Sequence, residues 1–149
     1  MNGRLVWFVL VLVLCCLAFD GNCGKNSPLP AKLLNASTVY VDPLIIGCPD
    51  TCADDVYREL ADWNRLKLVT EEREADLVFQ FTGTTEVVRM QGTGDPSYTY
   101  AVHFNVLDAK TGECLWRSSR ERGIVTPKPA RDLMKELRSR IDAQRQQKT

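Results

Sequence analysis

The stretch Tyr98–Ser119, which reads YTYAVHFNVLDAKTGECLWRSS, decides how the rest of the chain must fold. Its apolar residues recur at every second position: Tyr98, Tyr100, Val102, Phe104 and Val106. Successive side chains of a β-strand point to opposite faces, so this alternation predicts a strand with one buried face. Asp108–Gly112 has the composition of a turn, and Glu113–Ser119 then predicts a returning strand. We therefore expect a β-hairpin with one apolar face.

The two faces of this hairpin are expected to have different roles. Trp116 is predicted to anchor the core, and Cys114 is expected to share its face as a small core residue. The opposite face stays open once the apolar face is covered, and it is the candidate surface for a partner. The candidate residues on it are His103, Asn105, Leu107, Leu115 and Arg117.

Two stretches with helical periodicity are predicted to cover the apolar face. In the first, Thr51 suits the N-cap position, and Val56, Leu60 and Trp63 fall on one side of the helix. Glu59 is expected on the opposite side, in solvent. The second stretch begins after two prolines, and its apolar stripe comprises Leu133, Leu137 and Ile141.

Three further stretches predict strands of the same sheet, namely Thr38–Pro43, Leu66–Val69 and Leu77–Phe81, the last continuing through Val87–Met90. Strands and helices in this order predict the α+β class. The expected architecture is two helices packed on one face of a mostly antiparallel sheet of four to five strands, after an N-terminal signal segment.

The N-terminus has the pattern of a secretory signal. Arg4 precedes the apolar run Leu5–Leu14, and small residues follow that run. We expect cleavage after Ala18 and an exported protein, either periplasmic or associated with the cell envelope. An uncleaved anchor and a lipidated cysteine are the alternatives, although the apolar run is short for a spanning helix. Membrane contact is expected only through such an uncleaved or lipidated N-terminus.

The 149 residues are a one-domain length. We predict a signal peptide over residues 1–18 and a linker over 19–37, which is rich in Gly, Asn, Ser and Pro. A single α+β domain is predicted over residues 38–143, followed by a disordered polar tail over 144–149.

Four cysteines remain after the predicted cleavage, and oxidising compartments favour disulfides. Cys48 and Cys52, in the sequence CPDTC, are close enough to pair at the entry to the first helix. A zinc site that also uses Cys114 and His103 has suitable ligand types, but it lacks the two close ligand pairs of a zinc ribbon. We therefore predict a Cys48–Cys52 disulfide and no metal site.

The charge balance and the lack of catalytic patterns exclude several classes of function. The chain has 19 basic and 19 acidic residues, whereas a nucleic-acid-binding protein usually has a basic face, so no nucleic-acid partner is expected. His103 is the only histidine, and no motif supplies the partner that a general base needs. We nominate no catalytic residue, no cofactor and no enzymatic activity.

Two short motifs resemble a group of bacterial cell-envelope proteins. The strand-leading Ala75-Asp76-Leu77-Val78 and the turn Asp108–Trp116, DAKTGECLW, are similar to the corresponding elements of this group. The group includes small lipoproteins of unknown function and the swivelling α+β domain at the amino terminus of TolB-like and CsgG-like proteins. The chain departs from the lipoprotein pattern because it has no clean lipidation motif. The resemblance implies a scaffold or assembly module, and it carries over no catalytic residue.

The expected function is that of an exported, non-enzymatic envelope domain that binds or assembles with another envelope protein. The open face or the edge of the predicted sheet would make this contact. The alternative is a ligand-binding or enzymatic envelope domain whose site the sequence does not reveal. A concave pocket with convergent polar groups would favour that alternative.

Overall fold

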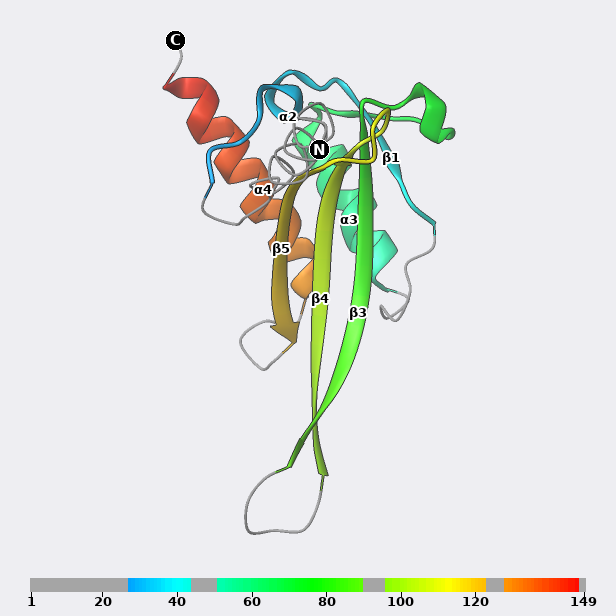
Figure 1. The fold of residues 1–149 in the computed structure, drawn as a ribbon, viewed down its shortest axis with the longest axis vertical. Helices are drawn as coiled ribbons and strands as arrows, with labels where there is room; N and C mark the ends of the chain where they lie inside the picture. Colours follow the sequence, from blue (N-terminus) through cyan, green and yellow to red (C-terminus); the bar gives the residue numbers. More distant parts are fainter. Residues whose placement is uncertain (1–26, 44–50, 90–95, 123–127, 148–149) are drawn as a thin grey trace, which may run out of the picture.

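The computed structural model of the chain describes residues 27–43, 51–89, 96–122 and 128–147. The elements in chain order are α2 (Ala31–Asn35), β1 (Thr38–Val41), α3 (Thr51–Trp63), β2 (Lys67–Leu68), a short 3-10 helix (Glu72–Glu74), β3 (Leu77–Arg89), β4 (Pro96–Asp108), β5 (Cys114–Arg122) and α4 (Pro129–Gln146). Figure 1 shows α3 and α4 on the same side of the sheet. None of the helices in the described ranges is long and apolar enough to cross a membrane.

The strands form one five-stranded sheet in the order β2-β1-β3-β4-β5. β1 runs parallel to both of its neighbours, and β3, β4 and β5 are antiparallel. β1 and β2 are parallel because α3 connects them, and such a crossover returns the chain in the same direction. The predicted α+β class, with two helices packed on a mostly antiparallel sheet, is confirmed.

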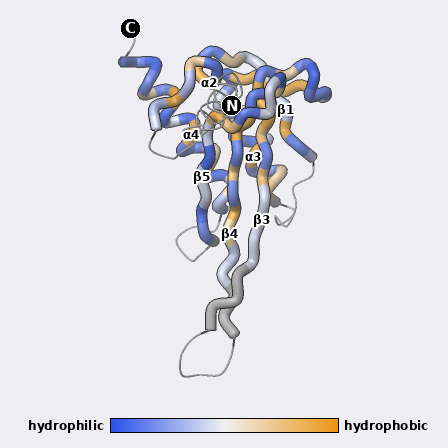
Figure 2. Tube along the Cα trace, viewed as in Figure 1, coloured by the Kyte–Doolittle hydropathy of each residue, from blue (hydrophilic) through white to orange (hydrophobic). Residues whose placement is uncertain are grey.

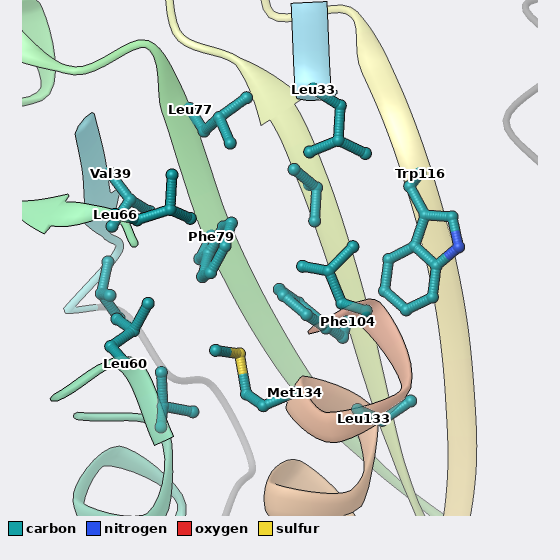
Figure 3. Close-up of a cluster of buried hydrophobic side chains, with 14 of the residues drawn as sticks. Leu33, Val39, Leu60, Leu66, Leu77, Phe79, Phe104, Trp116, Leu133 and Met134 are labelled. Carbon is teal, nitrogen blue, oxygen red and sulfur yellow. The ribbon is translucent and has the colours of Figure 1, made fainter. Parts of the chain in front are cut away.

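The core forms where the alternating apolar residues of the strands meet the helices. Trp116 is only 1% exposed, so its predicted role as a core anchor is confirmed. Its ring meets the edge of the Phe104 ring at 5.5 Å between centroids, and Phe81 stacks on Phe104 at 4.2 Å. Figure 3 shows Phe79, Phe104 and Trp116 in one cluster with side chains from the helices. The predicted inward residues of both helices are buried as well: Val56, Leu60, Trp63, Leu133, Leu137 and Ile141.

Glu59 does not lie in solvent as expected, because α4 packs beside α3 on that side. Glu59 is 5% exposed, and its Oε1 accepts a hydrogen bond from Arg131 Nε at 2.7 Å. One turn earlier, Asp55 is also buried and forms an ion pair with Lys128 at 3.5 Å. These two pairs link the described start of α4 to α3.

The predicted linker is wrong in its second half. Residues 31–35 form helix α2, and its Leu33 and Leu34 are buried together with the preceding Leu29. Leu33 lies in the same cluster as Leu77 and Trp116 (Figure 3). The predicted tail also begins too early, because α4 extends to Gln146. Gln144 donates to and accepts from the backbone of Leu29, at 3.3 and 3.0 Å. The domain therefore begins before residue 38.

A β-bulge in β5 changes which residues share a face. Val106 pairs with Trp116 and Leu107 pairs with Cys114, so Leu115 is an extra residue between the two pairs. Cys114 therefore lies on the side of Leu107, not on the side of Trp116 as expected, and it is half-buried. Leu115 belongs to the core cluster and is 5% exposed, so its assignment to the partner face is wrong.

The cysteines also differ from the prediction. Cys52 is a buried thiol in the first turn of α3 and takes no part in a disulfide, so the predicted Cys48–Cys52 pair is not formed. The physical reason is helical spacing, because Cys52 precedes Val56 by one turn and so enters the core as a small apolar side chain. Cys48 lies outside the described residues. Cys114, expected as a small core residue, is disulfide-bonded.

Figure 2 shows that the C-terminal part of α4 is largely hydrophilic, in contrast to the helix side that carries the core residues. The most polar positions of this part are exposed, including Arg145 and Gln146. This distribution is that of a helix covering one side of a sheet with its other side in water.

Candidate functional site

The first candidate site is the side of the sheet opposite α3 and α4, which we call the outer face. Strand pairing arranges its side chains in four rows, because directly paired residues point to the same side of a sheet. The rows are Tyr40–Val78–Leu107, Gln80–Asn105–Arg117, Thr82–His103–Ser119 and Thr84–Ala101–Glu121. No helix of the described residues lies over these rows, as Figure 1 shows for β3, β4 and β5.

The outer face brings together four of the five predicted partner-face residues. Asn105 pairs with Arg117, and His103 and Leu107 lie one row away on either side. His103, Asn105 and Leu107 are half-buried, and Arg117 is exposed. Leu115 is the exception, because the bulge turns it into the core.

The row nearest the β4–β5 turn is apolar. Val78 was expected to face away from the core, and it does lie on the outer face. It is nevertheless buried there, at 6% exposed. Its neighbours in the row are Tyr40 and Leu107, which are both half-buried. An aromatic ring beside two aliphatic side chains, next to polar rows, resembles the composition of a protein–protein contact.

Among the described residues, the His103 side chain makes one hydrogen bond, at 2.9 Å between its Nε2 and the Thr84 hydroxyl. Its cross-strand neighbours are Thr82 and Ser119. Base catalysis needs a further group that fixes the imidazole tautomer, usually a carboxylate on the other ring nitrogen. Among the described residues, the hydrogen bonds of His103 include no such carboxylate. The arrangement fits a polar contact surface better than a catalytic dyad.

A two-stranded ribbon continues the sheet beyond this face. β3 and β4 pair over their whole length, from Leu77↔Asp108 to Arg89↔Pro96, whereas β5 pairs with β4 only from Leu107 to Tyr100. The last part of β3 and the first part of β4 therefore have no third strand among the described residues. Figure 1 shows this ribbon projecting past the ends of the helices. An isolated two-stranded hairpin is marginally stable in water, so such a ribbon is suited to being covered by a partner.

The second candidate site is a pocket of about 300 Å³ at the end of the sheet where α2 meets the β4–β5 turn. Its lining comes from segments far apart in the sequence: Lys32, Asn35, Ala36, Asp76, Asp108, Lys110 and Thr111. The lining includes the two motif carboxylates, so their contacts decide whether the pocket can recognise a ligand.

Asp76 connects the start of β3 to the start of β1. Its Oδ2 accepts hydrogen bonds from the Ser37 amide at 2.8 Å, the Ser37 hydroxyl at 3.0 Å and the Thr38 amide at 3.1 Å. The Asp76 amide in turn donates to the Thr38 hydroxyl at 2.8 Å. The Ser37 and Thr38 donors stabilise the ionised carboxylate and hold the pKa of Asp76 below its usual value. The aspartate therefore joins two parallel strands.

Asp108 organises the β4–β5 turn. Its Oδ1 accepts hydrogen bonds from the amides of Lys110 at 2.8 Å and Thr111 at 3.0 Å, and its Oδ2 forms an ion pair with Lys32 at 2.8 Å. Lys32 is the main cause that lowers the pKa of Asp108 to about 2, and the turn amides add to it. Gly112 closes the turn with a φ of 69°, which glycine adopts without strain. The D-x-x-x-G motif therefore stabilises the β4–β5 turn and holds α2 against it.

The pocket retains few groups for a ligand, because both of its carboxylates already bind groups of the chain. The sequence showed Asp76 and Asp108 only as motif residues and did not reveal Lys32 or Ser37. No sequence pattern points to these two partners, because they are distant from Asp76 and Asp108 in the chain and belong to the stretch that was predicted as a linker. Within the described residues, no group of three or more His, Cys, Asp or Glu side chains is placed to hold a metal ion.

No protein-family model and no curated protein matches the chain. Solved structures similar to it include the PelC dodecamer from Paraburkholderia phytofirmans, at 16% identity over 75% of this chain and 94% of that one, with a TM-score of 0.45. Lipoprotein GNA1162 from Neisseria meningitidis is 17% identical over 72% and 96%, with a TM-score of 0.41. A minor lipoprotein from Acinetobacter baumannii is 14% identical over 73% and 94%, with a TM-score of 0.37. These are fold likenesses at low identity, and they assign no function to this chain.

Proposed function

We propose that this chain is an exported cell-envelope module that binds another protein on its outer face and acts without catalysis. The observation that carries the proposal is the apolar row Tyr40–Val78–Leu107, aligned across three strands on a side of the sheet that no described helix covers. Export is supported by the N-terminal pattern of Arg4 followed by Leu5–Leu14.

The row supports binding because of its composition and its surroundings. Tyrosine buries a large area while its hydroxyl stays available for hydrogen bonding, which is why it is enriched in interface centres. The adjacent rows offer uncharged polar groups, including Gln80, Asn105 and Thr82. Such groups form the polar rim that commonly surrounds the apolar centre of an interface.

The size of the outer face indicates that the ribbon takes part. Eight paired residues on three strands, at about 3.3 Å per residue and about 4.8 Å between strands, cover about 400 Å². A specific interface buries about 800 Å² on each partner. A partner that also contacts the projecting β3–β4 ribbon would supply the remaining area. It would also stabilise a ribbon that has two strands only.

Site-specific photo-crosslinking in the native envelope tests this proposal. A photoreactive residue at Leu107 is expected to crosslink one defined partner, whereas the same residue at Lys135, which is exposed on α4, is expected to give no such product. The second step is Tyr40→Ala in the Leu107 background, which should abolish the product while the melting temperature stays within a few degrees. Equal crosslinking from both positions, or a product that persists after Tyr40→Ala, would contradict the proposal.

The pocket beside Asp76 and Asp108 favours a second candidate, the binding of a small molecule. Lys110 and Asn35 are exposed polar residues of its lining, and among the described residues their side chains take no part in the hydrogen bonds of the turn or of α2. A thermal-shift screen with small carboxylates and phosphates, repeated on Lys110→Ala, tests it. A stabilisation that disappears in the variant would support ligand binding there.

A further inference from the structure

β5 is an edge strand of the sheet, and its outward side carries both positive and negative residues. Within the described residues it pairs with β4 alone, so the backbone groups on its other side are not part of a described ladder. Figure 1 shows β5 at the border of the sheet. An edge strand of nine residues is a template on which another strand can pair.

The outward residues of β5 carry opposite charges on the two sides of Ser119, positive before it and negative after it. Arg117 lies two residues before Ser119 and Glu121 two residues after it. All three are exposed and lie on the outer face. If a second β5 runs antiparallel to the first around Ser119, each Arg117 faces the Glu121 of the other copy. Opposite charges at directly paired positions stabilise a sheet, and like charges there destabilise it.

We propose that two copies of this chain pair through β5, antiparallel around Ser119, so that their sheets join into one continuous sheet. The pairing places residues of the same face opposite each other, because Arg117, Ser119 and Glu121 alternate with the inward residues. The two outer faces then lie on the same side of the joined sheet. The interface uses the edge strand, so the proposal does not depend on the proposed function of the outer face.

The charge pattern selects this register over its neighbours. Centring the pair on residue 118 places Arg117 opposite Ser119, and centring it on residue 120 places Glu121 opposite Ser119. Both neighbouring registers lose both Arg–Glu pairs. A centre between residues 118 and 119 places Arg117 opposite Arg120, which is repulsive. If the charges on this edge served only to prevent aggregation, they would not need to be complementary to the β5 charges of a second copy of the chain.

The inward side of β5 is compatible with the pairing because its polar groups are occupied within the chain. Arg120 donates to Glu136 of α4 at 2.8 Å, and Ser118 donates to the same carboxylate at 3.4 Å. These contacts hold the β5 side chains against α4. The new contacts are therefore the backbone ladder and the two outward Arg–Glu pairs. The pairing of one edge strand from each copy buries an area at the low end of specific interfaces. We therefore expect a dimer that dissociates on dilution.

Sedimentation velocity of the mature chain over a range of concentrations tests the proposal. The wild type is expected to shift from monomer to dimer as concentration rises. Arg117→Glu places Glu opposite Glu twice and should leave only monomer. The double variant Arg117→Glu with Glu121→Arg should restore the dimer. Lys135→Glu, which makes the same charge change at an exposed position of α4, is the matched control and should dimerise like the wild type.

A second measurement reads the register directly. Ser119→Cys places the new thiol opposite its own copy, so mild oxidation should give a covalent dimer through that residue, found by peptide mapping. Glu121→Cys should give much less, because it faces Arg117. Three results overturn the proposal: a wild type that stays monomeric at all concentrations, a double variant that fails to restore dimerisation, or equal crosslinking of both cysteine variants. A wild type that stays monomeric while the photoreactive residue at Leu107 still crosslinks its partner would refute the edge pairing and leave the proposed function standing.

Discussion

Replacing Trp116 by alanine tests the architecture of the whole sheet. The side chain is 1% exposed and packs edge-on against Phe104, with ring centroids 5.5 Å apart. Truncating a buried aromatic residue removes its transfer free energy and leaves a cavity, so Trp116→Ala should lower the free energy of unfolding by about 3–5 kcal/mol. A domain of this size has about 5–15 kcal/mol in total, so the variant should be poorly folded or scarce.

Trp116→Phe provides a graded comparison. Among the described residues, the indole Nε1–H is buried and has no hydrogen-bond acceptor. A buried donor without an acceptor costs about 1–3 kcal/mol, and phenylalanine removes that donor while keeping a ring against Phe104. Trp116→Phe should therefore lose much less stability than Trp116→Ala. If the donor had a partner, the two losses would be closer.

His103→Ala is the control on the outer face. His103 is half-buried and makes one side-chain hydrogen bond, with the exposed Thr84. A substitution at such a position should change the free energy of unfolding by about 0.5 kcal/mol, and by about 1 kcal/mol at most. Thermal and urea unfolding of the three variants and the parent measures all of these values. The reasoning is refuted if Trp116→Ala melts like the parent while His103→Ala unfolds.

Asp108→Asn should lower the melting temperature at pH 7, while Glu113→Gln, in the same turn but exposed, should change it little. The pKa of Asp108 is about 2 in the folded protein and about 4 in the unfolded chain. The stabilisation by the ionised Asp108 is therefore present above about pH 4 and is lost as the pH falls towards 2. In Asp108→Asn the melting temperature should fall less steeply with pH in that range. Arg131→Ala should destabilise the fold because it leaves the buried Glu59 carboxylate without its ion-pair partner, and the loss should largely disappear in a Glu59→Gln background, as a double-mutant cycle would show. Alkylation followed by mass spectrometry should label Cys52 only after unfolding, and labelling at the native rate of an exposed thiol would contradict its burial.

The two proposed contacts use different parts of the sheet. The apolar row at Tyr40, Val78 and Leu107 lies at one end of the outer face, and Arg117–Glu121 lies along the border strand. In a dimer paired through β5, the two apolar rows would face the same side of one larger sheet. Such an arrangement would present two equivalent sites to a partner, so the two contacts would reinforce each other by raising the effective concentration of the second site.

Local periodicity in the sequence was enough to predict the elements that form the core. Phe79 and Phe81, like Phe104 and Val106, alternate because a strand places every second side chain on one face. The stripe on α4 follows from the helical repeat in the same way, as at Leu137 and Ile141. These patterns depend only on backbone geometry within a few residues, so the α+β class and the buried role of Trp116 could be predicted.

Only the tertiary structure decided the features that depend on distant parts of the chain. The bulge at Leu115 reflects the pairing of β5 with β4, so no local pattern could place that leucine in the core and Cys114 on the other side. Helix α2 is five residues long, too short to show a helical repeat, and it is held by burial of Leu33 and by the Lys32–Asp108 ion pair. Glu59 has the spacing of a solvent-facing residue, yet α4 covers it. In each case the deciding contact joins residues that are brought together by chain topology, which a local sequence pattern does not encode.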